Sequence, residues 1–439
     1  MIEYHLPIVP HGAKAALASN AGIAGDLRET ITMRSLVSGI CLCLLADPGL
    51  ADDWPQFLGP TRNGVSAETG LDAAARRKDW PPVIWERRIG QGWSGPVVAG
   101  DRLILFHRLG DNEIVQCLGA ADGKERWKFK YPTNYIDDFN FDPGPRATPL
   151  IAGKNVYTLG AEGKMHCLEL ATGKKVWDRA LGEEYKAAKG FFGIATSPVL
   201  EGDLLLVNIG GKDAGIVALN RDTGKEVWKA TRDAASYSSP VVTTIQGDRH
   251  ALFLTREGIA ALNPANGKVL FQKRWRSRNN ASVNAATPIV SGNEVFFSAS
   301  YGTGAILLAA RNQGYEEVWS NDDSLSCHYG TPVSKDGYLY GFHGRQEQKA
   351  ILRCVEWKTG KVQWSKERFG CGSMILADGK LIILSEDGEL VLVEATPKGY
   401  KELARAQVLG SACRAQIALA NGRLYARDTR KLVCLGLKK

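Results

Sequence analysis

The sequence lacks several features that mark common functional classes. It has no dense run of Lys or Arg, although the 439-residue chain carries a net charge of +8, so a nucleic-acid footprint is not expected. No two histidines have a ligand-like interval, and the motifs G-x-S-x-G, H-E-x-x-H and C-x-x-C-H are absent. No apolar run approaches the roughly 20 residues that span a bilayer. The sequence therefore offers no familiar catalytic constellation and no transmembrane segment.

A sustained helical period is also missing, which argues against substantial helix. Glycine, in contrast, is abundant at 48 residues, and turn pairs such as Asp378-Gly379, Asp387-Gly388 and Asn421-Gly422 are frequent. Asp-Gly and Asn-Gly between alternating apolar and polar runs are strong hairpin signals. The composition therefore predicts an all-β chain of many short strands.

Two short sequence anchors recur with a spacing of roughly 40–50 residues, which suits a blade of four short strands. The first anchor is a small residue, often Ser or Thr, followed by Pro and then by apolar residues. Its copies, of which the last two are weaker, are Gly95–Val98, Thr148–Ile151, Ser197–Leu200, Ser239–Val242, Thr287–Val290, Thr331–Val333, Ser373–Leu376 and Ala415–Ala418.

The second anchor has the form T-G-K-x-x-W, and one of its copies lies out of order near the N-terminus. The last repeat stops where its Trp strand should begin, so the N-terminal copy supplies that strand and closes the ring. We therefore predict an all-β, eight-bladed β-propeller of four-stranded antiparallel blades, closed by an N-terminal strand that completes the last blade. The copies are Asp122–Trp127, Thr172–Trp177, Thr223–Trp228, Asn266–Phe271, Gln313–Trp319, Thr359–Trp364, the degenerate Pro397–Leu403, and Pro82–Trp85.

The recurring residues are expected to be structural. A Trp near the outer edge covers the next blade, and the Gly permits a turn with positive φ. A disulfide between Cys371 and Cys413, in adjacent repeats, is left open. Four further cysteines recur at one repeat position, too far apart to pair as a set, and are expected to be small apolar fillers: Cys117, Cys167, Cys354 and Cys434.

The N-terminus carries an export pattern. Met33-Arg34 precedes an apolar run from Leu36 to Ala46 and a small-residue end at Gly49–Ala51, as in a secretory signal. The alternative is a buried apolar segment. We expect a periplasmic or secreted protein in which residues 1–32 are a mis-called upstream extension, 33–51 a signal peptide starting at Met33, 52–82 a leader segment packing on the propeller, and 83–439 the propeller.

The A-T-P start and T-G-K-x-x-W finish of the repeat resemble the pyrroloquinoline-quinone-like (PQQ-like) propeller repeat over about residues 83–437. That family includes quinoprotein alcohol dehydrogenases and the non-catalytic scaffold of the outer-membrane β-barrel assembly machinery. The opening Asp53–Pro60, with Arg62–Gly64, looks like the leader of exported members. The resemblance implies the fold but leaves both classes of function open.

The dehydrogenase members bind PQQ and a calcium ion in the central channel, and many stack the quinone between a Trp and a disulfide of adjacent cysteines. This sequence has no Cys-Cys pair and lacks the long insertions that usually build those sites. It therefore resembles the assembly scaffold more than the catalytic members. Calcium takes about six to eight oxygen ligands, and the acidic residues of the inter-blade loops are expected to be solvated charges: Asp137, Asp138, Asp142, Asp322 and Asp323.

A ligand site is expected where the loops leading into the innermost strands surround one mouth of the channel. The residue three positions before each Pro lies there, and neighbouring positions add to the set. Aromatic and Arg side chains suit an anionic, sugar-like or peptide ligand; the alternative is channel lining that packs or binds water. The predicted ligand-binding residues are Trp93, Arg146, Tyr237, Asn284, His328, Tyr329 and Arg414, with Ala195, Ala285 and Cys371 at equivalent places.

Two loops complete the hypothesis, because long aromatic loops are often functional. Tyr131–Pro145 and Tyr185–Ile194 are predicted to form a recognition surface with Tyr135, Phe139, Phe141, Phe191 and Phe192. We expect a monomeric, non-catalytic exported propeller that binds a protein or glycan partner, with no cofactor, metal or nucleic acid. The alternative is a PQQ- and calcium-dependent quinoprotein dehydrogenase that oxidises alcohols or sugars.

Overall fold

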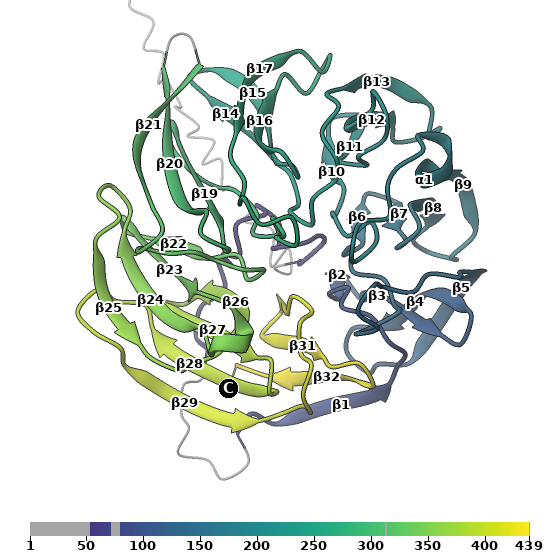
Figure 1. Cartoon of the computed structure of the whole chain (residues 1–439). Coiled ribbons are helices and arrows are strands. Elements are labelled where there is room, and N and C mark those ends of the chain that lie inside the picture. Colours follow the sequence, from purple (N-terminus) through teal and green to yellow (C-terminus); the bar gives the residue numbers. More distant parts are fainter. Residues whose placement is uncertain (1–52, 72–79, 312–313, 439) are drawn as a thin grey trace, which may run out of the picture. The chain divides into compact units, whose positions relative to one another are not determined.

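The computed structural model describes residues 53–71, 80–311 and 314–438. These residues form eight four-stranded antiparallel sheets set around a centre (Figure 1), with one short α-helix and one 3-10 helix. The all-β, eight-bladed propeller is therefore confirmed. The expected extension at 1–32 and signal peptide at 33–51 lie outside the described residues. No helix in the described part of the chain is long and apolar enough to cross a membrane.

The first four blades follow the chain from the innermost strand outward. Their strands are β2 (Val97–Ala99), β3 (Arg102–Leu109), β4 (Asn112–Gly119) and β5 (Glu125–Pro132); β6 (Leu150–Ala152), β7 (Asn155–Leu159), β8 (Lys164–Glu169) and β9 (Lys175–Ala180), followed by α1 (Leu181–Glu184); β10 (Val199–Glu201), β11 (Leu204–Val207), β12 (Ile216–Asn220) and β13 (Glu226–Ala230); and β14 (Val241–Ile245), β15 (Asp248–Leu254), β16 (Gly258–Leu262) and β17 (Val269–Arg274).

The last four blades repeat this order, except that the outermost strand of the eighth comes from the N-terminal side. Their strands are β18 (Ile289–Ser291), β19 (Glu294–Ala299), β20 (Gly304–Arg311) and β21 (Gly314–Asn321); β22 (Val333–Lys335), β23 (Tyr338–His343), β24 (Ile351–Glu356) and β25 (Val362–Lys366), with the 3-10 helix Gln346–Gln348; β26 (Gly372–Ala377), β27 (Lys380–Ser385), β28 (Glu389–Glu394) and β29 (Glu402–Gln407); and β30 (Ala418–Ala420), β31 (Arg423–Arg427), β32 (Lys431–Gly436) and β1 (Val83–Arg88).

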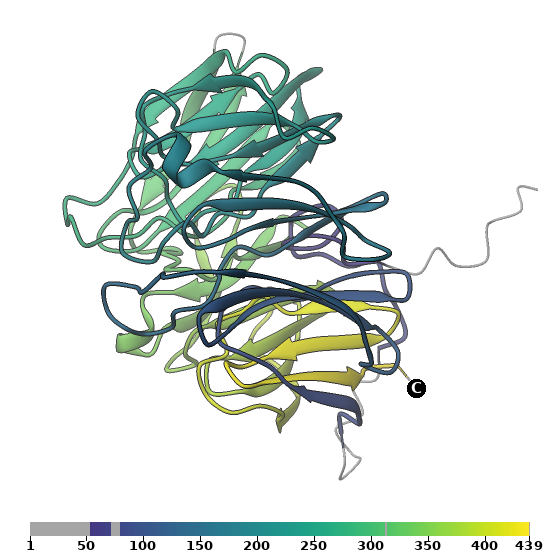
Figure 2. The same ribbon diagram turned by 90° about the vertical axis from the view of Figure 1, so that its right-hand side faces the viewer.

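The ring is closed as the sequence predicts. Strand β1 pairs antiparallel with β32, placing Trp85 opposite Cys434, and the sheet order is β1-β32-β31-β30. Both views show β1 beside the yellow C-terminal strands (Figures 1 and 2). Since the two ends of the propeller share one sheet, the eighth blade has no unfinished outer strand in the described structure.

Each recurring Trp joins its blade to the next one. The indole Nε1 donates a hydrogen bond to a backbone carbonyl at the turn of the following blade, and, except at Trp364, the Gly of that turn lies against the ring. A Cβ at Gly173, whose φ is +73°, would lie 2.5 Å from Cε3 of Trp127. Glycine is therefore required for contact as well as for backbone conformation. The indole bonds run from Trp85 to Ala120, Trp127 to Leu170, Trp177 to Arg221, Trp228 to Pro264, Trp319 to Trp357 and Trp364 to Thr396.

The Ser or Thr before each Pro links the blades near the channel. Its hydroxyl accepts a hydrogen bond from the backbone N–H at the equivalent position of the preceding blade, which explains why a hydroxyl recurs there. These bonds, of 2.9–3.4 Å, run from Gly95 to Thr148, Thr148 to Ser197, Ser197 to Ser239, Ser239 to Thr287 and Thr287 to Thr331.

The recurring cysteines pack beside the tryptophans, as expected of small apolar fillers. Cys117, Cys167 and Cys354 stand opposite Trp127, Trp177 and Trp364 on neighbouring strands, so a small side chain fits beside each indole. All seven described cysteines are buried free thiols. The pair Cys371 and Cys413, for which a disulfide was left open, is therefore not bridged in this structure.

The leader crosses the centre of the ring (Figure 1). Trp54 pairs with Val98 of the first blade, and Val65 pairs with Leu376 of the seventh. Between them, the buried Arg62 guanidinium donates to backbone carbonyls of the third and fourth blades, those of Ser197, Pro198 and Pro240. Burial lowers the pKa of Arg62 to about 9, and the three carbonyls compensate its lost hydration.

Candidate functional site

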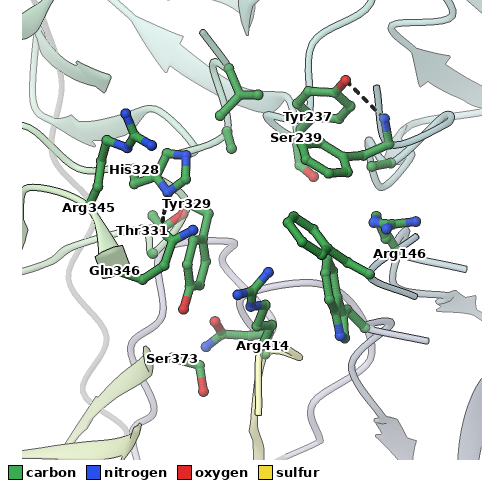
Figure 3. Close-up of a pocket in the computed structure, with 18 of the residues that line it drawn as sticks. Arg146, Tyr237, Ser239, His328, Tyr329, Thr331, Arg345, Gln346, Ser373 and Arg414 are labelled. Carbon is green, nitrogen blue, oxygen red and sulfur yellow. Dashed lines mark hydrogen bonds between the residues drawn. The ribbon is translucent and has the colours of Figure 1, made fainter. Parts of the chain in front are cut away.

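A cavity of about 450 Å³ lies at one mouth of the channel (Figure 3). Its wall is built by the loops that enter the innermost strands and by loops between second and third strands. Phe57 of the leader also lines it. A smaller cavity of about 280 Å³, lined in part by Arg62, shares no lining residue with it. The leader thus lies between two separate spaces.

Most of the predicted mouth residues share this cavity. Trp93, Arg146, Tyr237, His328, Tyr329 and Arg414 all line it, as do Ala195 and Ala285. Asn284 does not: it is buried, and its amide nitrogen donates to the carbonyl of Thr255 at 2.8 Å. Cys371 is also buried and does not line the cavity. The residues three positions before each Pro therefore line this mouth. Of the residues one position earlier, only His328 does.

Trp93 lies between two guanidinium groups. The Cζ of Arg146 is 4.6 Å from the centre of the indole ring and that of Arg414 is 4.7 Å from it. Arg414 donates from Nε to Glu386 at 2.7 Å, and Arg146 pairs with Asp137 at 3.0 Å. Cation–π contacts of this kind contribute roughly 0.5–2 kcal/mol. The Trp93 ring and both guanidinium groups are therefore held in place before any ligand arrives.

The long loop Tyr131–Pro145 is organised by two buried carboxylates. Asp137 accepts from the backbone N–H groups of Phe139, Phe141 and Asp142 as well as from Arg146. These donors hold the pKa of Asp137 below its usual value against the opposing effect of burial. Asp142 in turn accepts from the N–H groups of Gly92 and Gly144.

The expectation that all the loop carboxylates are solvated is therefore wrong for two of them. Asp137 and Asp142 are only 4% and 1% exposed, because backbone donors replace water. Asp138, Asp322 and Asp323 are exposed, as expected.

Four phenylalanines from the two predicted loops form an aromatic cluster. The rings of Phe139 and Phe141 stack with centres 5.5 Å apart, and both contact Phe192. The hydroxyl of Tyr237 accepts from the N–H groups of Phe191 and Phe192, which fixes the second loop. Phe139 and Phe141 remain 49% and 58% exposed.

Tyr135 and Phe191 have supporting positions. Tyr135 is buried, and its hydroxyl accepts a 3.1 Å bond from Arg146. Phe191 contacts the rings of Phe139 and Phe192 and does not line the cavity.

The facing wall contains residues that sequence reasoning missed. Tyr301 and Arg345 lie on connections between second and third strands, with the Arg345 guanidinium 4.4 Å from the centre of the Tyr301 ring. His328 is hydrogen-bonded to two residues of this wall. Its Nε2 lies 3.0 Å from the Tyr301 hydroxyl, and its Nδ1 lies 2.5 Å from Oε1 of Gln346. Because strands alternate in direction, these connections share a face with the loops that enter the first strands. The connection 344–350 is longer than most of its equivalents in the other blades, which is a signal for Arg345 but not for Tyr301, whose connection 300–303 is short.

Several polar atoms of the cavity wall have no hydrogen-bond partner among the described residues: Trp93 Nε1, Arg146 Nε, the Tyr329 hydroxyl and Ser373 Oγ. Burial raises the pKa of Tyr329 well above its usual value, so its hydroxyl stays protonated. Burial also lowers the pKa of His328, which is therefore neutral at pH 7.

The wall does not fit the calcium–quinone centre that the repeat family implies for its dehydrogenases. Among the described residues, Glu347 is the only carboxylate that lines the cavity, and it pairs with Arg345 at 3.1 Å. Calcium takes about six to eight oxygen ligands, several of them usually carboxylate oxygens. Within residues 53–71, 80–311 and 314–438, no group of three or more His, Cys, Asp or Glu is arranged to hold a metal ion.

A family model described as outer membrane protein assembly factor BamB matches residues 110–366. BamB of Burkholderia pseudomallei is 24% identical over 260 residues, 56% of this chain and 61% of that protein. The quinoprotein alcohol dehydrogenase PedH of Pseudomonas putida is 32% identical over 140 residues, 30% of this chain and 23% of that protein.

Among solved structures, the quinohemoprotein alcohol dehydrogenase from Comamonas testosteroni matches with a TM-score of 0.65 at 14% identity, over 88% of this chain and 81% of that one. This likeness concerns the fold. The chain spans less than two thirds of the curated relatives named here. Since the family model covers more than half of the sequence, the chain belongs to the family described as outer membrane protein assembly factor BamB.

Proposed function

We propose that this chain is a non-catalytic binding propeller that acts in the periplasm as a scaffold for a protein partner in outer-membrane protein assembly. Family membership supports this class of function. A protein is chosen over a glycan because the relatives carrying the family name are described as protein assembly factors. In this proposal the cavity uses no quinone cofactor and no metal.

The observation that carries the proposal is the exposed aromatic surface at the mouth. Phe139 and Phe141 are about half exposed on a loop that Asp137 holds rigid. Exposed apolar groups beside Arg and Trp are typical of protein contact sites. A rigid loop also loses little conformational entropy on binding.

The size of the effect follows from exposed area. Fully burying a Phe side chain is worth about 1.5–3 kcal/mol, so covering two half-exposed rings contributes about 2 kcal/mol, or about thirtyfold in affinity. The mouth thus offers a useful share of the energy of a protein contact.

Photo-crosslinking in the cell envelope of the source organism tests the proposal. A photoreactive amino acid replaces Phe139 in one variant and Lys124 in a matched control. Lys124 lies on the turn between β4 and β5, on the opposite face from the mouth loops, with its side chain 75% exposed. We expect a discrete protein adduct from the Phe139 position, identified by mass spectrometry as a component of outer-membrane protein assembly. Adducts that are equal at both positions, or absent at Phe139, would contradict the proposal.

A further inference from the structure

We infer that the centre of the ring contains a guanidinium-binding site made of backbone carbonyls, and that Arg62 of the leader is its resident ligand. Through this site the leader is held across the channel as an intramolecular strap. The inference is independent of the proposed function, because Arg62 does not line the mouth cavity. The ligand class of the site is an alkylguanidinium cation, which can also enter as a free ion when the Arg62 side chain is removed.

The innermost strands of the blades have one free edge each. Each of these strands has a sheet partner on one side only, so its other edge faces the channel (Figure 1). Peptide groups along such an edge need partners that the blade itself cannot supply. The leader supplies backbone partners to the innermost strands of the first, second and seventh blades, through Trp54 with Val98, Pro55 with Ile151, and Gly64 with Leu376. The third and fourth blades are bonded by a side chain instead, that of Arg62.

The Arg62 guanidinium uses all three of its nitrogens in this site. Its Nε donates to the carbonyl of Pro240 at 2.9 Å, its Nη1 to that of Pro198 at 3.1 Å, and its Nη2 to that of Ser197 at 3.2 Å. The Nη1 atom also donates to the side-chain oxygen of Gln56 at 3.1 Å. A lysine ammonium, whose three donors share one nitrogen, cannot reproduce the planar fork that these acceptors surround. The arrangement therefore selects a guanidinium and not merely a positive charge.

The Arg62 cation is buried among neutral oxygens. The residue is only 4% exposed, and among the described residues its side chain bonds only to the three carbonyls and the Gln56 amide. Burying a charge without an opposite charge is costly, so the carbonyl dipoles have to compensate. The φ of Arg62 is +54°, in the left-handed region that favours Gly. A non-Gly residue persists there when its surroundings over-determine it, and here the surroundings are the acceptors of its guanidinium.

A free ligand has a route to this site. Arg62 lines the second cavity, of about 280 Å³, together with residues of the innermost strands of the fourth and fifth blades. Thr244 and Gly292 belong to the same lining and are exposed, so the cavity opens to solvent. Removing the Arg62 side chain would therefore leave a carbonyl-lined space that dissolved ions can reach.

Chemical rescue of the full-length protein tests the inference. Arg62→Gly empties the site, and Gly also suits the local φ, so the loss of stability reports the missing side chain. We expect its melting temperature to fall by about 3–6 °C, because hydrogen bonds to a charged group are lost. The probe is n-propylguanidinium, which carries the same three carbons and fork as the Arg side chain. At millimolar concentrations it should raise the melting temperature of Arg62→Gly saturably, by about 1–2 °C. The matched cation n-propylammonium should not.

Two further forms provide the test should Arg62→Gly not fold. Arg62→Lys keeps the charge and lacks the fork, so it should melt about 2 °C or more below the unchanged protein. Arg232→Lys is its matched control at a side chain that is 85% exposed, and it should melt as the unchanged protein does. The unchanged protein, whose site is filled by Arg62, should show no saturable response to n-propylguanidinium.

Three results would each overturn the inference. One is the absence of a saturable rise with n-propylguanidinium in folded Arg62→Gly. Another is an equal rise with n-propylammonium, which would reduce the site to a general cation effect. The third is an equal melting temperature for Arg62→Lys and the unchanged protein, which would show that the fork is not recognised.

Discussion

Replacing Gly173 by Ala probes the contact that joins neighbouring blades. The added Cβ would lie 2.5 Å from Trp127, well inside van der Waals contact, at a backbone φ of +73°. The ring cannot move freely, because its Nε1 donates to Leu170 at 2.9 Å. Two costs therefore add: a left-handed backbone of roughly 1–2 kcal/mol and overpacking of about 1–3 kcal/mol.

Gly202 offers a matched control. Its φ is +56°, and a Cβ there would meet nothing within 4 Å. Gly202→Ala should thus cost only the strain of a left-handed backbone. Ala also lowers the conformational entropy of the unfolded chain, but this effect is the same in both variants. We expect Gly173→Ala to lower the free energy of unfolding by about 1–3 kcal/mol more than Gly202→Ala.

Urea unfolding followed by Trp fluorescence measures this difference as a shift in midpoint at unchanged slope. Equal midpoints for the two variants, or a larger loss in Gly202→Ala, would refute the reasoning that the Gly is needed for indole contact.

Three further outcomes follow from the site and the core. Asp137→Asn should loosen the Tyr131–Pro145 loop, since its charged hydrogen bonds are worth about 1.5–3 kcal/mol each, and chymotrypsin should cleave it faster than in the unchanged protein. Burial lowers the pKa of His107 to about 4, below the ordinary 6.5. The stability that neutral His107 contributes is therefore fully present above pH 6.5 and is lost as the pH falls toward 4. The urea midpoint should fall over this pH range, and it should fall less in His107→Gln. Calorimetric titration with PQQ and Ca²⁺ should show no one-to-one binding. Micromolar binding would contradict the conclusion that the cavity wall does not fit a calcium–quinone centre.

The repeat was readable from sequence because each anchor residue makes the same bond in blade after blade. Trp127 reaches the next turn, and Thr148 accepts from the preceding blade. Because the same inter-blade contact recurs, the same residue type recurs in the sequence. The out-of-order Trp85 indicated the ring closure for this reason. The cysteine opposite the Trp is visible as a pattern too, although its partner strand is not.

The rest of the site depends on contacts that no repeat encodes. Arg62 bonds to carbonyls of Ser197, Pro198 and Pro240, which are 135 to 178 residues away in the chain. Asp137 looked like one of several loop acids, and only the folded loop brings three backbone N–H groups to it.

Tyr301 lies on a connection that the anchors do not mark. Asn284 was expected at the mouth because it lies next to a mouth position in the sequence. Its side chain instead turns inward and donates to the buried carbonyl of Thr255.

The most direct test of the central claim is the affinity of the partner identified by crosslinking for three forms of the purified protein. We predict that replacing both Phe139 and Phe141 by Ala weakens binding about thirtyfold, as the burial of two half-exposed rings requires. Lys124→Gln should bind as the unchanged protein does. Equal affinities for all three forms would show that the mouth is not the docking surface and would contradict the account.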